Sequence, residues 1–353
     1  MYMWKFINDN LLEFKECFSR QAPFKWFIIV VIGLMVRTDQ LGVTSIIRAL
    51  GINPRHYESL LHFFRAGSWQ LERIILKWIS VVGNSGLLYR ICGKPLLIGD
   101  GVKESKEACK MPGVKKLVQE SENSAKPQYM HGHMFGAIGL LLGTPQKWFC
   151  TLLSMRLHDG NKTIGQWSSD ALAGQSHVVR LIQEACQIAL HLEPCILALD
   201  RYFLTIPALT TLSNCEEQHG VGLVNIVTKA KKNIVAYEQP ELKSSGKGRP
   251  RKKGVAVKLQ DLFATESSSF CNTNVNMYGK SEEVKFLVKD LLWGQGLYRE
   301  LRFVLVKHAQ RTAILVSTDT TLTPESIITD FHGNKTTPKN PVHIKRNIFS
   351  KTA

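Results

Sequence analysis

Apolar residues recur at helical spacing through residues 1–90, which are therefore predicted to be helical. The clearest repeat runs over residues 43–50 and again over 57–64, with apolar side chains three and four positions apart. Gly51 suits the end of the first helix and Pro54 the first turn of the second. Two short helices across a tight turn are typical of a DNA-reading helix-turn-helix and also of an ordinary core-forming pair, and the pattern leaves both interpretations open.

From residue 95 the pattern changes to short apolar runs bounded by turn residues, which predict buried strands. A helical stripe follows at residues 177–192, and a second helix is expected around 208–212. The order is strands first and then helix alternating with strand, which indicates a mixed α/β sheet. The strands of this region are expected at residues 95–98, 135–143, 148–160, 194–200 and 221–230.

Residues 229–258 interrupt this pattern with ten Lys or Arg and two Glu, a local charge of +8, and residues 244–254 are expected to form an exposed loop. Alternating strands resume at residues 284–293, 301–308 and 312–318. A helix is then predicted to start with Thr323 as its cap and Pro324 at its first position. Residues 332–353 hold two prolines, no acid and five Lys or Arg, which predicts a disordered basic tail.

The chain has 353 residues and a formal net charge of +16. That surplus favours a polyanionic partner, nucleic acid first and an anionic membrane surface second, although a basic protein need not have either. The longest apolar run has eleven residues, 26–36, and predicts a buried helix because a membrane span needs about 20. Neither a secretory signal nor a CxxC pair among the eight cysteines is visible, which fits a reducing cytoplasmic setting without structural zinc.

Two acids stand where buried strands are expected to end. Asp100 lies between Gly99 and Gly101 after one apolar run, and Asp200 follows another. Active sites of α/β sheets lie at the carboxyl ends of strands, and two carboxylates from separate strands are a usual site for Mg²⁺ or Mn²⁺. The two glycines would let a metal or a nucleic-acid backbone come close to Asp100. The alternative is that each aspartate caps the turn or helix that follows it.

Four blocks of the sequence resemble bacterial insertion-sequence transposases of the DDE group, which have a ribonuclease H-like core. The resemblance covers roughly residues 20–330, and its blocks occur in the family's order. The blocks begin "PLLIGDGVKESKEACK" at residue 95, "LALDRYFLTIPAL" at 197, "LLWGQGLYRELRFVLVKH" at 291 and "ILVSTDTTLTPESII" at 314. The resemblance implies that Asp100 is the acid of the first core strand, that Asp200 is the acid after the fourth, and that both bind Mg²⁺ or Mn²⁺.

The resemblance also implies an architecture. The expected fold is α/β, a ribonuclease H-like mixed sheet with a β-rich insertion and an N-terminal helical region. Its parts are a helical, possibly DNA-binding region at 1–90, the first part of the catalytic core at 91–232, a basic β-rich insertion at 233–315, the start of the last core helix at 316–331 and the basic tail at 332–353. The resemblance also implies a homodimer that binds double-stranded DNA at insertion-sequence ends and at target DNA. The implied location is the bacterial nucleoid, not a membrane.

The family's third acid is a Glu on the last helix, in the pattern Tyr-x2-Arg-x3-Glu-x6-Lys. Here Phe331, Asn334 and Pro338 take the Tyr, Arg and Glu positions, and Lys345 takes the Lys position. Proline cannot bind a metal and breaks a helix interior at a cost of about 3 kcal/mol. This departure predicts a defective copy, truncated or frameshifted near Phe331.

Two other glutamates are candidates for the third acid. Glu300 has a Tyr and an Arg directly before it, so the three side chains cannot share a helical face, and the residues after it alternate like a strand. Glu325 lies on the correct helix but one or more turns too early. Neither replaces the missing residue well.

The basic block supplies the candidate DNA-binding residues: Lys229, Lys231, Lys232, Lys247, Arg249, Arg251, Lys252 and Lys253. Residues 248–251 resemble the core of an AT-hook, which lays Arg into a narrow minor groove; a solvated basic loop is the alternative. Trp293 is a candidate for stacking on an unpaired base, as tryptophans in related insertions do, and otherwise a core residue. The sequence therefore predicts a DNA transposase with an incomplete catalytic triad; the alternative is an inactive DNA-binding protein that occupies transposon ends or inhibits active transposase.

Overall fold

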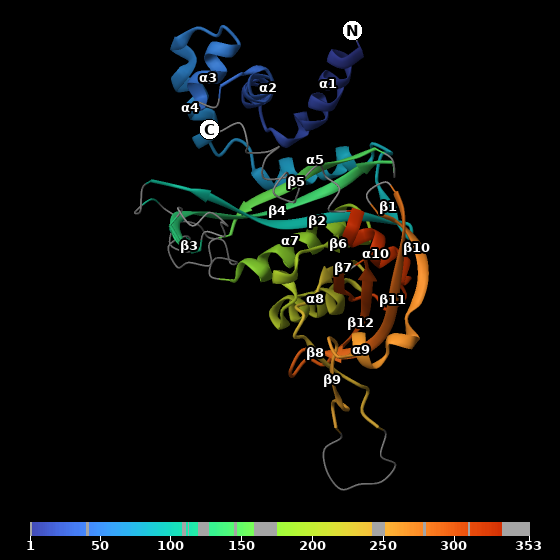
Figure 1. The fold of residues 1–353 in the computed structure, drawn as a ribbon. Coiled ribbons are helices and arrows are strands. Elements are labelled where there is room, and N and C mark those ends of the chain that lie inside the picture. Colours follow the sequence, from blue (N-terminus) through green and yellow to red (C-terminus); the bar gives the residue numbers. More distant parts are fainter. Residues whose placement is uncertain are drawn as a thin grey trace. The chain divides into compact units, whose positions relative to one another are not determined.

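The computed structural model of the chain describes residues 2–39, 42–107, 111, 113–118, 127–144, 147–158, 175–241, 251–277, 280–309 and 311–333. They fall into two compact units that divide between Gly86 and Leu87 (Figure 1). None of the helices in these ranges combines the length and the apolar composition that a bilayer-spanning segment needs.

The first unit is helical, as its periodicity predicted. Its elements are α1 (Tyr2–Glu13), η1 (Phe14–Cys17), α2 (Gln21–Val36), α3 (Gly42–Ala49), η2 (Pro54–His56), α4 (Tyr57–Arg65) and α5 (Leu71–Gly83). The predicted pair of short helices is confirmed as α3 and α4. The Asn53 side chain accepts a hydrogen bond from the Arg55 amide at 3.0 Å and so starts η2. Buried Leu60 and Phe63 of α4 pack with Ile46 and Ile47 of α3 in the core of this unit.

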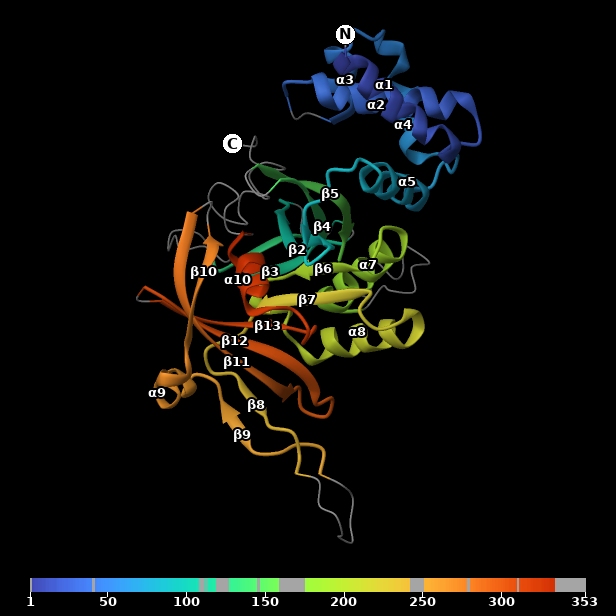
Figure 2. The ribbon, with the colours of Figure 1, turned by 90° about the vertical axis from the view of Figure 1, so that its right-hand side faces the viewer.

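The second unit contains one mixed sheet of 13 strands within the described residues. The strands are β1 (Arg90–Ile91), β2 (Lys94–Ser105), β3 (Lys115–Val118), β4 (Tyr129–Gly143), β5 (Trp148–Leu157), β6 (Cys195–Ala198), β7 (Val224–Lys229), β8 (Val235–Tyr237), β9 (Ala256–Lys258), β10 (Cys271–Met277), β11 (Lys280–Trp293), β12 (Arg299–His308) and β13 (Arg311–Ser317). Their order is β3-β4-β2-β6-β7-β13-β12-β11-β8-β9, with β1 beside β2, β5 beside β4 and β10 beside β11. Figure 2 shows β7, β13, β12 and β11 following one another across it.

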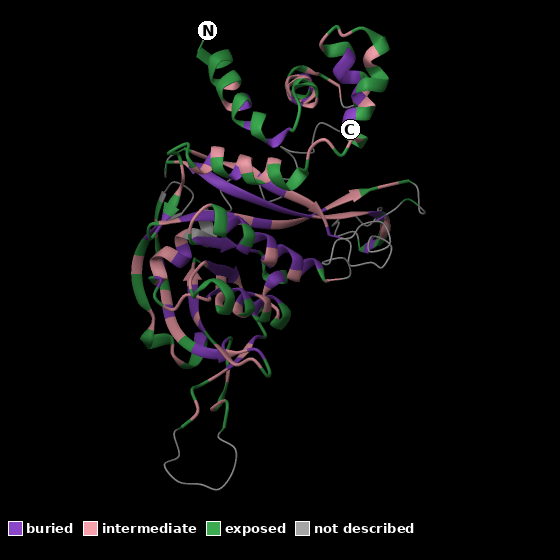
Figure 3. Ribbon diagram, turned by 180° about the vertical axis from the view of Figure 1, so that it is seen from behind, coloured by how far each residue is buried: buried purple, intermediate pink, exposed green. Residues whose placement is uncertain are grey.

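Helices cover both faces of the sheet around β2, β6 and β7 (Figure 2). They are α7 (His177–His191) and α8 (Ile206–His219) on one face and α10 (Pro324–Gly333) on the other, with the short η3 (Arg201–Phe203), α9 (Leu262–Thr265) and η4 (Ser267–Ser269) elsewhere. Leu181 of α7 lies against Gly99 of β2. Ile327 and Ile328 of α10 belong to a core cluster with Leu96 of β2. Because successive strand residues face opposite sides, Leu96 and Gly99 mark the two faces. Figure 3 shows buried residues concentrated in the central strands.

The mixed α/β sheet predicted from the sequence is confirmed. The strands expected at 284–293, 301–308 and 312–318 are present as β11, β12 and β13. The helix expected at 177–192 is α7. All the strands from β8 to β13 join the same sheet as β7, so the expected β-rich insertion continues the core sheet. The predicted tail beyond α10, including Pro338 and Lys345, lies outside the described residues.

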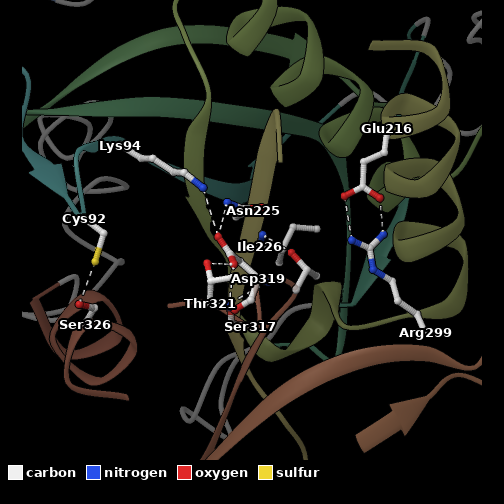
Figure 4. A network of polar contacts seen from close by, with 11 residues as sticks. Cys92, Lys94, Glu216, Asn225, Ile226, Arg299, Ser317, Asp319, Thr321 and Ser326 are labelled. Carbon is white, nitrogen blue, oxygen red and sulfur yellow. Dashed lines mark hydrogen bonds and ion pairs between the residues drawn. The ribbon is translucent and has the colours of Figure 1, made fainter. Parts of the chain in front are cut away.

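Asp319, in the turn between β13 and α10, joins three parts of the sheet (Figure 4). Its Oδ2 accepts hydrogen bonds from Lys94 Nζ of β2 at 3.2 Å and from Asn225 Nδ2 of β7 at 2.9 Å. Its Oδ1 accepts from the Thr321 amide at 2.9 Å and the Thr321 hydroxyl at 2.6 Å. Burial alone would raise the pKa of Asp319, but the hydrogen bonds from Thr321 and the ammonium of Lys94 outweigh it and lower that pKa. The turn thus fixes the start of α10 next to β2.

Replacing Asp319 by alanine is expected to lower the free energy of unfolding by about 1–3 kcal/mol, because Lys94 and Asn225 lose a shared acceptor. Urea unfolding followed by circular dichroism measures the change. Asp261→Ala, at an exposed aspartate of the same unit, is the matched control and should change stability by less than about 0.5 kcal/mol. Equal stability of the two variants would contradict this role for Asp319.

Candidate functional site

Asp100 lies inside strand β2 and not at its end. The parallel pairing of β2 with β6 stops at Ile98 and Ala198, whereas its antiparallel pairing with β4 continues to Ser105 and Gly132. The expectation that the strand ends at Asp100 is therefore wrong. The 15-residue β4 keeps β2 paired after the four-residue β6 has left the sheet, so backbone pairing overrides the low strand propensity around Asp100.

Asp100 and Asp200 each lie two residues beyond the last paired residues of β2 and β6. Leu97 pairs with Leu197 and Ile98 with Ala198. The backbone is still extended at Asp200, with φ −78° and ψ 170°, and the same register continued by two residues would bring the two aspartates together. Neighbouring strands lie about 4.8 Å apart, which is close enough for two carboxylates on one face to share a divalent ion.

Both aspartates face the side of the sheet that α10 covers. Leu96 and Ile196, an even number of residues before Asp100 and Asp200, lie in the core cluster that contains Ile327 of α10. Side chains alternate between faces along extended backbone, so the aspartates share the face of Leu96 and Ile196.

Lys229, one of the residues predicted to bind DNA, faces the same side of the sheet. It pairs with Leu315 of β13, which lies in the α10-side core, and directly paired residues share a face. The parallel strands β6 and β7 pair up to Ala198 and Val227, two residues before Asp200 and Lys229. The registers continued by two residues would put the two aspartates and Lys229 in one row across three neighbouring strands.

Backbone amides orient one oxygen of each carboxylate. Asp100 Oδ1 accepts from the Gly101 amide at 2.7 Å, and Asp200 Oδ1 accepts from the Tyr202 amide at 2.8 Å. The interpretation that Asp200 caps the following turn is therefore confirmed, because it is the N-cap of η3. A cap uses one oxygen of the carboxylate, which has two, so capping and metal binding are compatible roles.

The residues fit a Mg²⁺ or Mn²⁺ ion of the kind held by few protein ligands. Mg²⁺ is usually bound through one or two carboxylates, with water and substrate phosphates completing its shell, and Asp100 and Asp200 supply two. Over the part of the chain that the structure describes, no group of three or more His, Cys, Asp or Glu side chains is placed to hold a metal.

The glycines beside Asp100 serve the opposite face. A Cβ atom on Gly99 would lie 2.6 Å from Leu199 Cδ2, and one on Gly101 would lie 2.8 Å from His177 Nε2. The interpretation that these glycines clear space around Asp100 for a metal or DNA is therefore wrong. They let α7 and the chain after β6 pack closely on β2, because alternation turns them away from the carboxylate.

Under Gly101 lies a buried polar cluster that the sequence did not reveal. His158 Nδ1 lies 2.9 Å from His177 Nδ1, and His158 Nε2 lies 3.2 Å from Glu184 Oε1. Arg156 Nε lies 3.2 Å from the same oxygen. His158 follows β5, and the other histidine and the glutamate come from α7. No sequence signal marks this cluster, because its residues obey no motif spacing.

Hydrogen-bond chemistry fixes one proton of this cluster. The carboxylate of Glu184 only accepts, so His158 Nε2 donates its proton to Glu184 Oε1. His177 Nε2 is buried and has no hydrogen-bond partner among the described residues. Burial, and after it the charges of His158, Lys115, Arg180 and Lys103, lowers the pKa of His177 to about 3.

The other predicted DNA-binding residues gather away from this row. Five of them flank the short strands β8 and β9: Lys231, Lys232, Arg251, Lys252 and Lys253. All are exposed except Lys253, which is half-buried with its Nζ 4.0 Å from the Tyr237 ring centre and 5.5 Å from that of Tyr298. Lys247 and Arg249, the centre of the AT-hook-like stretch, lie outside the described residues.

Trp293, the candidate base-stacking residue, is half-buried at the end of β11 and packs against the core cluster of β11 and β12. Glu300 lies in strand β12, as its alternating pattern predicted, and its carboxylate accepts from Gln239 Nε2 at 2.9 Å. Glu325 lies in the first turn of α10.

Comparison with known proteins adds little to this geometry. No family model matches the chain, and no curated protein is similar to it. Among solved structures, the NurA nuclease from Sulfolobus solfataricus is similar over 79% of this chain and 85% of that chain, with 8% sequence identity and a TM-score of 0.29. That similarity is too low to establish a common fold.

Proposed function

We propose that this chain is a DDE transposase by descent, built on a ribonuclease H-like core, whose strand-cleavage chemistry is incomplete. The observation that supports the proposal is the register of β2 and β6, because Asp100 and Asp200 each lie two residues beyond the last pair, Ile98 and Ala198. Two acids a hundred positions apart in the chain share this position only through tertiary structure.

The order of elements supports the proposal. Leaving aside the short β1 and β3, Asp100 lies in the first strand of the unit and Asp200 follows the fourth, as the resemblance implies. The strands β8 to β13 come between β7 and α10, where the family carries its β-rich insertion. The last helix, α10, packs on the face to which the aspartates point.

Asp100 and Asp200 would hold the Mg²⁺ or Mn²⁺, which in phosphodiester chemistry activates a nucleophile and stabilises the leaving oxygen. Lys229 would contact a DNA phosphate beside the carboxylates, and the basic residues around β8 and β9 would attract the duplex from further away. Partners would be the ends of an insertion sequence and target DNA, bound by a homodimer.

The alternative is an inactive DNA-binding protein that occupies transposon ends. It is favoured by Pro338 at the position of the family's third acid. With one of three metal-binding acids lost, the fixed geometry for in-line attack is lost as well. Both forms of the proposal predict DNA binding and a cation at the two aspartates, and they differ in cleavage.

Mn²⁺ binding, measured by the EPR signal of the free ion, is expected to weaken roughly tenfold or more in Asp100→Asn and in Asp200→Asn, because each removes a charged ligand. Asp261→Asn, at an exposed aspartate of the same unit, is the control and should bind Mn²⁺ like the wild type. Equal binding in all four proteins would contradict the metal site.

Cleavage of labelled DNA by the same proteins in Mn²⁺ separates the two alternatives. We expect little or no cleavage by the wild type. Robust cleavage that Asp100→Asn abolishes would show that the catalytic set is complete, and the proposal of a defective copy would then be wrong.

A further inference from the structure

A three-stranded arm made by the ends of β2 and β4 together with β3 extends from the sheet (Figure 1). It is defined here by residues 101–105 of β2, β3 (Lys115–Val118) and residues 129–135 of β4. The pairing of β2 with β4 continues seven residues past Ile98, to Ser105, and β3 then joins the other edge of β4. Among the described strands none pairs with β2 on the β6 side of this arm.

The register assigns the side chains of the arm to two faces. Asp100 pairs with Ala137, so the residues of β4 at even steps from Ala137 share the face of the aspartates. Lys116 pairs with His131 and Val118 with Tyr129, which brings two residues of β3 to the same face. The aspartate-side face of the arm therefore carries, from the site outwards, Phe135, His133, His131, Lys116, Tyr129 and Val118.

The outer part of this face is exposed and carries the basic and aromatic side chains that nucleic-acid-binding surfaces use. Lys116 and His131 are exposed, and Tyr129 and Val118 are 43% and 50% exposed. Lys116 Nζ lies 4.3 Å from the centre of the Tyr129 ring, a cation–π contact that holds both at the surface. Glu104, the acid of this face in β2, lies opposite His133 and nearer the core.

The opposite face differs. Lys115, adjacent to Lys116, points with Gly132 to the side of α7 and is half-buried. Buried Leu117 follows on that face. The arm thus turns its apolar side to α7 and keeps a lysine, a histidine and a tyrosine ring accessible on the side of Asp100, where a bound strand would continue from the acid pair.

We infer that the aspartate-side face of the arm binds DNA next to the acid pair, with Lys116 and His131 on phosphates and the Tyr129 ring on a base or sugar. Basic and aromatic side chains together are typical of surfaces that follow a nucleic-acid backbone, and aromatic stacking tolerates any base. This inference rests on the proposed DNA-processing function and names where the DNA would lie.

The test measures binding of fluorescein-labelled duplex and single-stranded DNA to the full chain by anisotropy over a range of salt concentrations. Lys116→Ala is expected to reduce the slope of log affinity against log salt by about 0.9, the loss of one phosphate contact. Lys115→Ala, the same change one residue away on the opposite face, is the matched control and should leave the slope unchanged. Tyr129→Ala is expected to weaken single-strand binding roughly fivefold or more.

The outcomes separate this inference from the proposed function. Unchanged thermal unfolding of Lys116→Ala and Tyr129→Ala is expected, because both residues are exposed, and it shows that lost affinity is not lost folding. If Lys116→Ala, Lys115→Ala and Tyr129→Ala all bind DNA as the wild type does, the inference about the arm is wrong and the proposed function is unaffected. If the wild type binds no DNA, the inference about the arm and the proposed function are both wrong. If DNA binding depends on the arm but no Mn²⁺ binds at the aspartates, the inference about the arm stands and the metal site is wrong.

Discussion

Gly136→Ala is expected to destabilise the second unit by about 3 kcal/mol or more, or to prevent its folding. Gly136 pairs with Gly101, and the two glycines face the buried histidine cluster. A Cβ atom on Gly136 would overlap the His158 ring. That ring is fully buried and held between His177 and Glu184, so it cannot move aside. Urea unfolding measures the loss, or the yield of soluble protein shows it.

Gly67→Ala provides the control for this change. Gly67 is a glycine at which an added Cβ would meet nothing within 4 Å, and it needs no unusual backbone angle. The substitution should be neutral or slightly stabilising. A second check is the double variant with His158→Ala, in which the added methyl group meets the space left by the ring. The double variant should then lose less unfolding free energy than the two single variants lose together. A loss equal to that sum would contradict a direct clash.

The second large effect is a loss of stability in acid that His177 causes. Its pKa is lowered from the ordinary value of 6.5 to about 3 by burial in the folded protein. Above about pH 6.5 His177 is unprotonated in both the folded and the unfolded chain, so it does not lower the free energy of unfolding. Below that pH the unfolded chain is protonated while the folded state is not. Stability should therefore fall by up to about 1.4 kcal/mol per pH unit until about pH 3.

His177→Gln removes the titrating group and should flatten the dependence of unfolding free energy on pH between about 6.5 and 4. His191→Gln, at an exposed histidine at the end of the same helix, is the control and should keep the wild-type slope. Carboxylates contribute to acid unfolding in all three proteins, so the difference between the two variants isolates His177. Identical slopes would show that His177 is protonated in the folded state.

The candidate site depends on pairing that no local pattern reports. Asp100 and Asp200 were found in the sequence because each follows an apolar run. Their position two residues beyond the paired parts of β2 and β6, and the face that Lys229 takes, come from the register of neighbouring strands. The role of the glycines around Asp100 does not follow from the sequence, because a sequence shows which side chains are small but not which neighbour fills the space. His158, His177 and Glu184 left no signal, since a buried cluster needs no fixed spacing along the chain.

The amino-acid pattern predicted the local elements of this protein: the paired helices α3 and α4, the apolar strands, the helix α7 and a mixed α/β sheet. Apolar periodicity and turn residues involve only a few neighbouring positions, so they can be recognised from the sequence. Where β2 ends and what packs behind Asp100 depend on how distant segments pair and pack. Those outcomes depend on contacts between segments far apart in sequence, and in a strand a shift of one residue would send every side chain to the other face.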